Sequence, residues 1–402
     1  MKKKDKADYD ICVVGGCGHV GLPLAICFAN AGKRVIIFDI DEDALATVSS
    51  GVMPFKEEGG EEHLKLAIKS GRLHLSNSPE AISKSDAVIL IMGTPVDEHL
   101  NPSFTGIIRT IKKYLPYFTN GQLLVLRSTV YPGTSQKIER IIRKSGLVVD
   151  VAFCPERIAE GFAIKETHEL PQIVAAFTQR GMRRARDLFQ TFTDDIVELE
   201  PMEAELAKLF TNVWRYIQFA IANQFYSIAN DHGLDYYRIH HAITHNYPRA
   251  KDLPRAGFAA GPCLFKDTMQ LAAFSKNSFF LGHAAMLVNE GQPAYIVDCL
   301  RRRYPLHKMT VGILGMAFKG DSDDSRESLA YKLRKILEIE CQEVLITDPY
   351  VKDERIRPLQ EVIEKSDILI VGAPHTVYKE LLIDDKPVVD IWNLFGRGGL
   401  IK

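Results

Sequence analysis

A glycine-rich turn between a strand and a helix places the tightest constraint on how this chain folds. The apolar run 10–14 is followed by a GxGxxG motif (Gly16, Gly18 and Gly21), by an apolar stretch of helical character, and by a second apolar run that ends at Asp39. Strand, helix and strand in this order is the unit of a parallel sheet. We therefore predict an α/β fold whose first sheet begins at residue 10.

The spacing of the motif predicts a dinucleotide at this turn. Glycines let the backbone approach a pyrophosphate, and the helix N-terminus offers unpaired N–H groups and the positive end of its dipole. Asp39 lies 18 residues after Gly21, and its carboxylate can accept hydrogen bonds from an adenosine ribose. No Arg or Lys follows over residues 39–43 to bind a 2′-phosphate, so we predict NAD rather than NADP. The alternative is a glycine-rich turn without a ligand.

The middle of the chain has a different pattern from its two ends. Residues 203–232 contain neither Pro nor Gly, and apolar side chains recur at helical spacing, which predicts one long helix of about 30 residues. More helices follow to about residue 303, and a second strand-and-glycine pattern begins at Val311. We predict two Rossmann-like parallel-sheet domains joined by a helical domain with one long central helix, with boundaries at 1–200, 201–303 and 304–402.

Composition and charge argue against several classes of protein. The formal net charge is -1, there is no run of roughly 18 apolar residues, and no apolar stretch of a signal peptide follows the charged start. The seven cysteines form no CxxC pair, which argues against a disulfide framework and for a reducing compartment. His240, His241 and His245 lack a carboxylate or Cys to complete a metal site. We expect a cytoplasmic protein that binds no nucleic acid, membrane or metal.

Two groups of residues indicate chemistry. Lys208 and Asn212 are four residues apart on the long helix, so they share one face, and a Lys with an amide donor suits an oxyanion. Cys263 lies near Lys266 and Asp267. A thiol beside a cation can lose its proton and attack a carbonyl, and a nearby carboxylate can act as a base for water. The alternatives are a solvated helix face for the first pair and a small buried side chain for the cysteine.

The other six cysteines are interpreted as small buried side chains. Cys154 is the strongest rival nucleophile because Glu156 is close to it in the sequence, but it ends an apolar strand. Cys17 lies in the glycine turn, where a small side chain fits.

Several longer motifs occur in a characteristic order. They are Ser128–Thr134 (STVYPGT), Cys154–Gly161 (CPERIAEG), Glu203–Asn212 (EAELAKLFTN), Gly261–Asp267 (GPCLFKD), Gly315–Lys319 (GMAFK) and Asp323–Ser328 (DDSRES). In their order and spacing the chain resembles the UDP-glucose/UDP-N-acetylmannosamine dehydrogenase family, from residue 11 to about residue 392. The joint match is specific, whereas any one motif would not be.

The resemblance implies an NAD-dependent, four-electron oxidation of the primary alcohol at carbon 6 of a nucleotide-sugar to a uronic acid. Carbon 6 becomes an aldehyde, and Cys263 adds to it to give a thiohemiacetal. A second loss of hydride gives a thioester, which water hydrolyses. Lys208 and Asn212 would stabilise the oxyanions, and Asp267 would be the base or the partner of Lys208.

The remaining site residues are implied by the same resemblance. Thr129 and Glu160 match positions that hold the catalytic water, Glu156 matches a glutamate of thioester hydrolysis, and Arg249 matches an arginine that reaches the sugar across a dimer. The residues expected at the cofactor are Gly16, Gly18, His19, Val20, Gly21, Asp39, Thr94, Pro95, Ser128 and Thr129. Those expected at the substrate are Glu156, Arg157, Lys208, Asn212, Arg249, Gly261, Lys319 and Arg326.

Some positions depart from the family and leave the sugar open. Trp392 stands where some members carry Arg, and the loop before Cys263 has fewer glycines and ends at Pro262. Residues 154–157 resemble the N-acetylhexosamine branch and residues 263–267 the UDP-glucose branch. The expected substrate is therefore UDP-glucose or a UDP-N-acetylhexosamine.

Two other functions are weighed against this one. A single-step β-hydroxyacid dehydrogenase would share the Rossmann domain, Lys208 and Asn212, but would need neither Cys263 nor a second α/β domain. A non-catalytic nucleotide-sugar-binding protein would not need the whole set of polar residues together. The long apolar helix also needs a partner surface, which predicts a homodimer.

Overall fold

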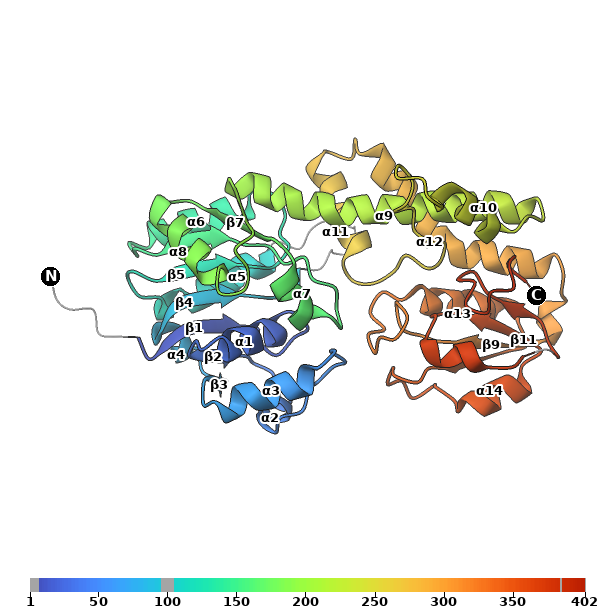
Figure 1. The fold of residues 1–402 in the computed structure, drawn as a ribbon, viewed down its shortest axis with the longest axis horizontal. Helices are drawn as coiled ribbons and strands as arrows, with labels where there is room; N and C mark the ends of the chain where they lie inside the picture. The colour runs from blue at the N-terminus through green and yellow to red at the C-terminus, as the bar shows by residue number, and fades with distance from the viewer. Residues whose placement is uncertain (1–6, 95–104, 384, 402) are drawn as a thin grey trace. The chain divides into compact units, whose positions relative to one another are not determined.

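The structure, a computed structural model, describes residues 7–94, 105–383 and 385–401 (Figure 1). The chain forms two compact units, Met1–Phe210 and Thr211–Lys402. The boundary falls inside one unbroken helix, α9 (Pro201–Asp231). The predicted long helix is therefore present, and it begins two residues before the expected start at residue 203.

The first unit is built on a sheet whose eight described strands have the order β3-β2-β1-β4-β5-β6-β7-β8. Neighbouring strands are parallel, except that β6 and β7 are antiparallel. The strands are β1 (Tyr9–Val14), β2 (Val35–Phe38), β3 (Leu73–Ser76), β4 (Ser85–Leu90), β5 (Leu123–Leu126), β6 (Asp150–Phe153), β7 (Gln172–Ala176) and β8 (Ile196–Leu199). The helices are α1 (Gly21–Asn30), α2 (Glu42–Ser49), α3 (Gly60–Lys69), α4 (Glu80–Ser83), α5 (Thr105–Tyr114), α6 (Thr134–Lys144), α7 (Ala163–Glu169) and α8 (Gln179–Phe189), with a short 3₁₀ helix η1 (Leu115–Tyr117).

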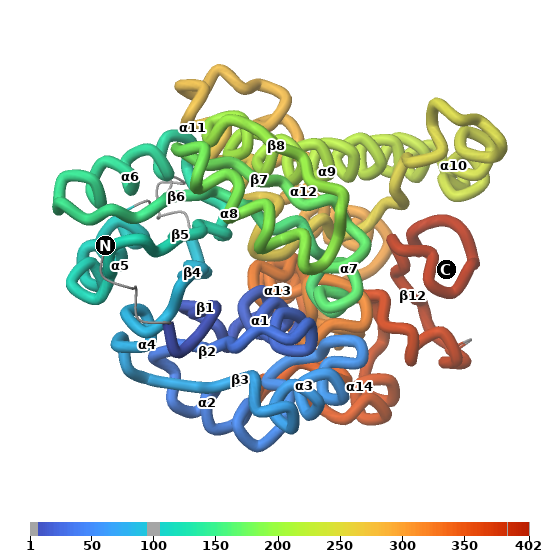
Figure 2. The backbone as a smooth tube through the Cα atoms, turned by 60° about the vertical axis from the view of Figure 1, so that its left-hand side comes forward, coloured from blue at the N-terminus to red at the C-terminus, as the bar shows by residue number. Residues whose placement is uncertain are grey.

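Helices cover both faces of this sheet. Ile11 and Val13 of β1 belong to a core that includes residues of α1, α7 and α8, whereas Cys12 and Val14 belong to a second core with residues of α5 and α6. In Figure 2, α5 and α6 lie on one side of the strands and α1 and α7 on the other. Because both faces are buried, the strands are continuous apolar runs rather than alternating ones.

The second unit contains the rest of α9, more helices and a smaller sheet. Its four described strands have the order β10-β9-β11-β12 and are all parallel. The strands are β9 (Thr310–Leu314), β10 (Glu343–Thr347), β11 (Ile368–Val371) and β12 (Val388–Val389). The helices are α10 (Tyr236–Thr244), α11 (Leu264–Phe274), α12 (Phe280–Arg301), α13 (Leu329–Glu340) and α14 (Leu359–Lys365), with 3₁₀ helices η2 (Leu306–Lys308) and η3 (Thr376–Glu380).

The predicted α/β fold class is confirmed, with a mainly parallel sheet in the first unit, a parallel sheet in the second, and helices between them in the sequence. The strands expected from apolar runs are present. Strand β3 has no long apolar run, and β7, which lies in the apolar run 173–177, pairs antiparallel to β6. The local sequence does not contain the information for that reversal.

The two sheets repeat one backbone device. After β1, Gly15 has φ 74° and donates from its N–H to Phe38, the last residue of β2. After β9, Gly315 has φ 92° and donates to Thr347, the last residue of β10. In each sheet an aspartate follows that second strand and accepts hydrogen bonds from the turn after the glycine. The second strand-and-glycine pattern in the sequence therefore corresponds to a structural repeat.

Asp348 is the aspartate of the second sheet, and it is almost completely buried. Its Oδ2 accepts from the N–H groups of Met316 (2.6 Å) and Ala317 (3.1 Å) and from Nε2 of His375 (3.0 Å). His375 Nδ1 accepts from a backbone N–H, so Nε2 carries the proton. Burial acts to raise the pKa of Asp348, but the hydrogen bonds from His375 and from backbone N–H groups outweigh it and lower the pKa to about 2.

We predict that Asp348→Asn lowers the free energy of unfolding at pH 7 by about 2 kcal/mol, the value that corresponds to the lowered pKa. Because the folded pKa lies below the unfolded one, this contribution is complete above about pH 4 and is lost as the pH falls towards 2. Urea unfolding of both proteins at several pH values checks it. Asp298 is exposed and pairs with Arg301, so Asp298→Asn is the control. It should change the free energy of unfolding by less than about 1 kcal/mol. A difference between wild type and Asp348→Asn that does not shrink below pH 4 would contradict this assignment.

Candidate active site

The turn after β1 brings the backbone close to any ligand that lies over it. A Cβ on Gly15 would lie 2.0 Å from the carbonyl oxygen of Ile91, and a Cβ on Gly21 would lie 2.6 Å from that of Gly15. A Cβ on Gly18 would meet no atom within 4 Å, so open space lies beside it. Gly15, just before the GxGxxG motif, is the glycine of the turn with positive φ. The motif spacing alone does not identify it.

The carboxylate of Asp39, the residue after β2, is oriented by backbone N–H groups. Its Oδ2 accepts from the N–H of Cys17 (2.9 Å) and its Oδ1 from that of Ile40 (2.8 Å). Helix α1 begins at Gly21, and Val20 before it makes no side-chain cap. An uncapped helix N-terminus, a glycine turn and an oriented carboxylate are the groups that bind the pyrophosphate and ribose of NAD, so the residues present fit this cofactor.

Other residues expected at the cofactor surround this turn. The His19 ring stacks on Phe55, with ring centroids 4.1 Å apart. Thr94, after β4, donates from Oγ1 to the carbonyl oxygen of Thr129 (2.7 Å), after β5. Ser128 accepts from the N–H of Met92 at 2.8 Å. The structure therefore ties together the loops after two neighbouring strands. Pro95, the other residue expected here, lies outside the described residues.

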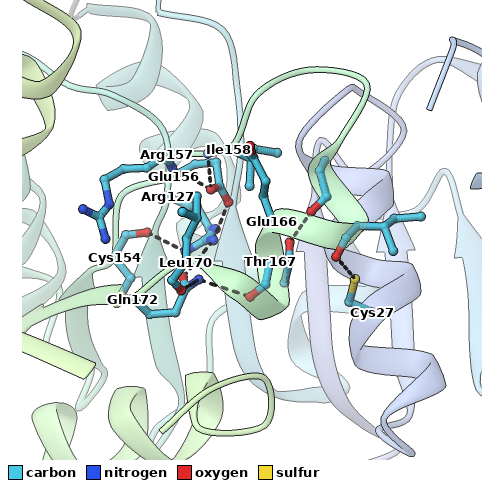
Figure 3. Close-up of polar contacts among 12 residues, drawn as sticks. Cys27, Arg127, Cys154, Glu156, Arg157, Ile158, Glu166, Thr167, Leu170 and Gln172 are labelled. Carbon is cyan, nitrogen blue, oxygen red and sulfur yellow. Dashed lines mark hydrogen bonds and ion pairs between the residues drawn. The ribbon is translucent and has the colours of Figure 1, made fainter. Parts of the chain in front are cut away.

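Glu156 belongs to a buried ion pair (Figure 3). Its partner Arg127 has no exposed side-chain surface and also donates to the carbonyl oxygen of Cys154 (3.1 Å) and to Gln172 Oε1 (3.2 Å). The other carboxylate oxygen of Glu156 accepts from the N–H groups of the next two residues, at 2.6 and 2.9 Å. A buried charge is costly without its partner, so this pair fixes the start of the loop after β6.

The same loop contains Arg157 and Glu160. The guanidinium of Arg157 donates to the carbonyl oxygen of Pro171, which lies before β7. Glu160 is half-buried, and the loop ends at Gly161, whose carbonyl oxygen accepts from the N–H of Glu58 at 2.9 Å. Arg157 therefore holds the loop in this structure.

Lys208 and Asn212 are both buried on α9, with exposed fractions of 8% and 5%. The alternative of a solvated helix face is therefore wrong. Asn212 Nδ2 donates to Asp267 Oδ2 at 2.6 Å. One turn before Lys208, the buried Glu205 accepts from the N–H groups of Gly133 (2.6 Å) and Ser135 (2.8 Å), at the start of α6. Glu205 thereby joins α9 to the end of the motif that contains Ser128 and Thr129, a link that the sequence pattern did not suggest.

Cys263 is the exposed one of the seven cysteines, all of which the structure describes. It is the N-cap residue of α11, and a helix N-terminus stabilises a thiolate beside it. Burial raises the pKa of the rival Cys154 to about 12, and the same cause raises that of Cys17 to about 12. Asp267, one turn into α11, is completely buried, and its Oδ1 lies 3.3 Å from Lys266 Nζ.

The second unit also contains the remaining residues expected at the substrate. Arg249 is exposed and donates to the hydroxyl of Tyr247 at 3.0 Å, whereas Arg326 forms a forked ion pair with Asp324. Lys319 Nζ lies 5.6 Å from the ring centroid of Phe318. A cavity of about 360 Å³ opens beside Gly261. Its lining residues are Ala260, Gly261, Phe265, Glu290, Ser325, Glu327, Ser328, Leu329, Tyr331, Lys332 and Lys335.

The glycine turn after β1, the uncapped N-terminus of α1 and the oriented carboxylate of Asp39 are the arrangement of an NAD-dependent dehydrogenase. Three models of the UDP-glucose/GDP-mannose dehydrogenase family match the chain: the NAD binding domain over residues 9–193, the central domain over 202–290 and the UDP binding domain over 312–397. The chain belongs to this family. Membership decides against the single-step β-hydroxyacid dehydrogenase.

Among the described residues, no helix combines the length and the apolar character that a membrane span needs.

Individual relatives agree with the family assignment. A UDP-N-acetyl-D-mannosamine dehydrogenase of Pyrococcus horikoshii is 30% identical over 379 residues, which cover 91% of this chain and 90% of that protein. The solved structure of that organism's enzyme has a TM-score of 0.90 at 27% identity and covers 97% of both chains. A UDP-glucose dehydrogenase of Pyrobaculum islandicum has a TM-score of 0.86 at 27% identity, and covers 97% of this chain and 95% of that one.

We predict that Glu156→Gln lowers the free energy of unfolding by about 3 kcal/mol, because it leaves the Arg127 charge buried without a counter-charge. The double variant Arg127→Met/Glu156→Gln should recover most of this loss, since neither charge remains. Urea unfolding of the three variants and the wild type measures both effects. A Glu156→Gln protein as stable as wild type, with only thioester hydrolysis slowed, would instead assign Glu156 a purely chemical role.

Proposed function

We propose that this protein oxidises carbon 6 of UDP-N-acetyl-D-mannosamine to the carboxylate, in two steps, through Cys263. The observation that carries the proposal is the position of this thiol: it is exposed, it begins α11, and it is followed by a buried Asp267 that binds Asn212. The N-acetylhexosamine branch is favoured because the P. horikoshii relative carries the name UDP-N-acetyl-D-mannosamine dehydrogenase. The runner-up substrate is UDP-glucose, as in the name of the P. islandicum structure.

The buried Lys–Asn pair suits the oxyanions of both halves of the reaction. An amide nitrogen has two hydrogens, and Asn212 Nδ2 uses one of them on Asp267, which leaves the other for substrate oxygen. The Lys208 ammonium supplies a positive charge on the same helix face. Donors that are fixed in place before the reaction stabilise developing negative charge without reorganisation. NAD, when bound, accepts the hydride of each oxidation.

The covalent steps belong to Cys263. Its thiolate adds to the aldehyde carbon to form a thiohemiacetal, which keeps a reactive aldehyde in place between the two oxidations. The second oxidation gives the thioester, and attack by water releases the carboxylate and restores the thiol. Asp267 is the candidate to accept the proton of that water, or to pair with Lys208, and Thr129 and Glu160 are the candidates to hold the water. Glu156 serves this step by fixing the loop that contains Glu160.

The three predicted domains divide the work. Residues 1–200 bind NAD, residues 201–303 present the helix α9 and the nucleophile, and residues 304–402 bind the nucleotide of the substrate. The cavity beside Gly261 supports a place for part of the substrate in the second unit. Lys319 and Arg326 are the cations assigned to its phosphates and sugar, and the forked pair with Asp324 holds Arg326 in one orientation.

We expect two molecules of NADH per sugar when UDP-N-acetyl-D-mannosamine is limiting, and a lower rate with UDP-glucose. Cys263→Ser should reduce turnover by at least about a hundredfold, because an alcohol is a poor substitute for a thiolate nucleophile. The absorbance of NADH at completion measures the yield per sugar, and its initial slope measures the turnover. Cys341→Ser, at a half-buried cysteine, is the matched control and should leave turnover unchanged. One NADH per sugar, or full activity in Cys263→Ser, would refute the mechanism.

We also propose that two copies pair through the outer face of α9. Large apolar side chains recur on this face at helical spacing and are between 39% and 61% exposed in the single chain. They are Phe210, Trp214, Ile221, Phe225 and Ile228. An apolar stripe along one long helix suits a second copy of itself, related by a two-fold axis. In the proposed dimer, Arg249 of one copy would reach the sugar that is bound to the other copy.

Light scattering at micromolar concentration should give the mass of a dimer. Phe225→Glu should shift the protein to monomer, since it places a charge within the apolar stripe, and activity should fall with it. Arg215→Glu also places a negative charge on an exposed position of α9, but on a different face of the helix from the stripe, and should leave the dimer intact. A wild-type monomer at these concentrations would disprove the pairing.

A further inference from the structure

The segment that contains Cys263 is bound to α9 at both of its ends. At its start, Gly257 donates from its N–H to Asn223 Oδ1 at 2.9 Å. At its end, Asp267 accepts from Asn212 Nδ2 at 2.6 Å. Asn212 and Asn223 are eleven residues apart, which is about three helical turns, so they lie on one face of α9. Cys263 lies between the two hydrogen bonds in the sequence.

Gly257 is enclosed on a second side by Trp392. Its φ is 155°, and a Cβ there would lie 2.2 Å from Cζ3 of the Trp392 indole. The Trp392 ring also meets Phe258 edge to face, with centroids 6.1 Å apart, and its Nε1 donates to the carbonyl oxygen of Val371 at 3.2 Å. The indole therefore cannot move away easily, and no side chain larger than a hydrogen fits at position 257.

Asn223 is itself held in one orientation. It is completely buried, and its Nδ2 donates to Asn289 Oδ1 at 2.9 Å. Asn289, also buried, donates from its Nδ2 to the carbonyl oxygen of Tyr216 at 3.0 Å. In each amide the nitrogen donates and the oxygen accepts. Rotation of the Asn223 amide would therefore leave buried polar groups unpaired. The oxygen that accepts from Gly257 stays where it is.

The segment is held at one more point between Gly257 and the thiol. Gly261 donates to the carbonyl oxygen of Glu327 at 3.3 Å, and a Cβ on it would lie 2.6 Å from the Phe318 ring. Pro262 follows, with its ring-restricted φ, and Cys263 is then the N-cap residue of α11.

We propose that Asn223 is a positioning residue for the nucleophile, and that with Trp392 it pins Gly257 and so sets the place of Cys263 at the N-terminus of α11. The proposal rests on the role of Cys263 in the proposed function. Loss of the contacts at Gly257 leaves the Cys263 thiol chemically unchanged but lets the start of the segment move. A displacement of about 1 Å in a reacting group is enough to cost a large factor in rate.

The test compares Asn223→Ala with Asn230→Ala. Asn230 is the matched control, because it lies two turns further along α9 and its Nδ2 donates to Tyr295 at 2.7 Å rather than to the nucleophile segment. Three quantities are measured: kcat and KM with the UDP-sugar, the rate of Cys263 alkylation by iodoacetamide against pH, followed by mass spectrometry, and Tm. Alkylation needs no substrate, so it reads the position of the thiol even if the proposed reaction is wrong.

We expect Asn223→Ala to lower kcat about tenfold with KM within about twofold of wild type. Alkylation at pH 7 should slow about threefold, because Cys263 is already accessible and its rate follows the thiolate fraction at the helix N-terminus. Asn230→Ala should lower Tm to a similar extent but leave kcat and alkylation unchanged. If Asn223→Ala behaves as Asn230→Ala does, the positioning role is refuted.

A second variant removes the contact between Trp392 and Gly257. Trp392→Leu vacates one side of Gly257 while Asn223 stays in place, and it should show the same loss of kcat and slower alkylation. Trp392→Leu also tests the positioning proposal if Asn223→Ala fails to fold. Unchanged alkylation of Cys263 in Trp392→Leu would overturn the proposal. A wild type that is alkylated at Cys263 but turns over no UDP-sugar would refute the proposed function, and the alkylation comparison would still stand.

Discussion

The buried polar side chains of α9 are the constraint on which the rest of the site depends. A long helix in a protein interior usually presents apolar side chains, and each buried polar group on it must find a partner or cost about 1–3 kcal/mol. Here Glu205 binds the start of α6, Asn212 binds Asp267, and Asn223 binds Gly257. Each partner lies in a loop or helix start that contains candidate catalytic residues, so the requirement to satisfy these groups also orders the chemistry.

The same arrangement of glycine and aspartate is built in both sheets, but the two aspartates have different partners. Asp39 and Asp348 both follow the second strand of their sheets and both accept from the turn after the first strand. Asp348 also accepts from His375 and from the N–H groups of Tyr350 and Val351. A carboxylate bound by so many protein donors is suited to hold its own loop together, whereas Asp39 makes fewer described bonds and is suited to a ribose.

Sequence periodicity and motif spacing predicted much of this architecture, because they report local physics. Apolar runs marked the strands that are buried on both faces, and the stretch without Pro or Gly marked α9. The reversal of β7 and the pairing of Arg127 with Glu156 depend on residues far apart in the chain, and no local spacing encodes them. Glu156 stays a predicted residue of thioester hydrolysis, and its ion pair with Arg127 is a contact that the motif did not suggest. Gly15 was missed because the GxGxxG pattern starts one residue later.

The contact between Gly257 and Trp392 has an evolutionary consequence. An indole 2.2 Å from the place of a Cβ excludes every side chain at position 257, and equally, a small residue at 392 would leave a void beside a bare glycine. The two positions therefore cannot drift independently. A lineage that exchanges Trp392 for an extended charged side chain frees the space beside position 257, and one that keeps the indole must keep the glycine. The pair should be inherited as a unit, and its joint replacement would mark a branch point at which the loop in front of the nucleophile was rebuilt.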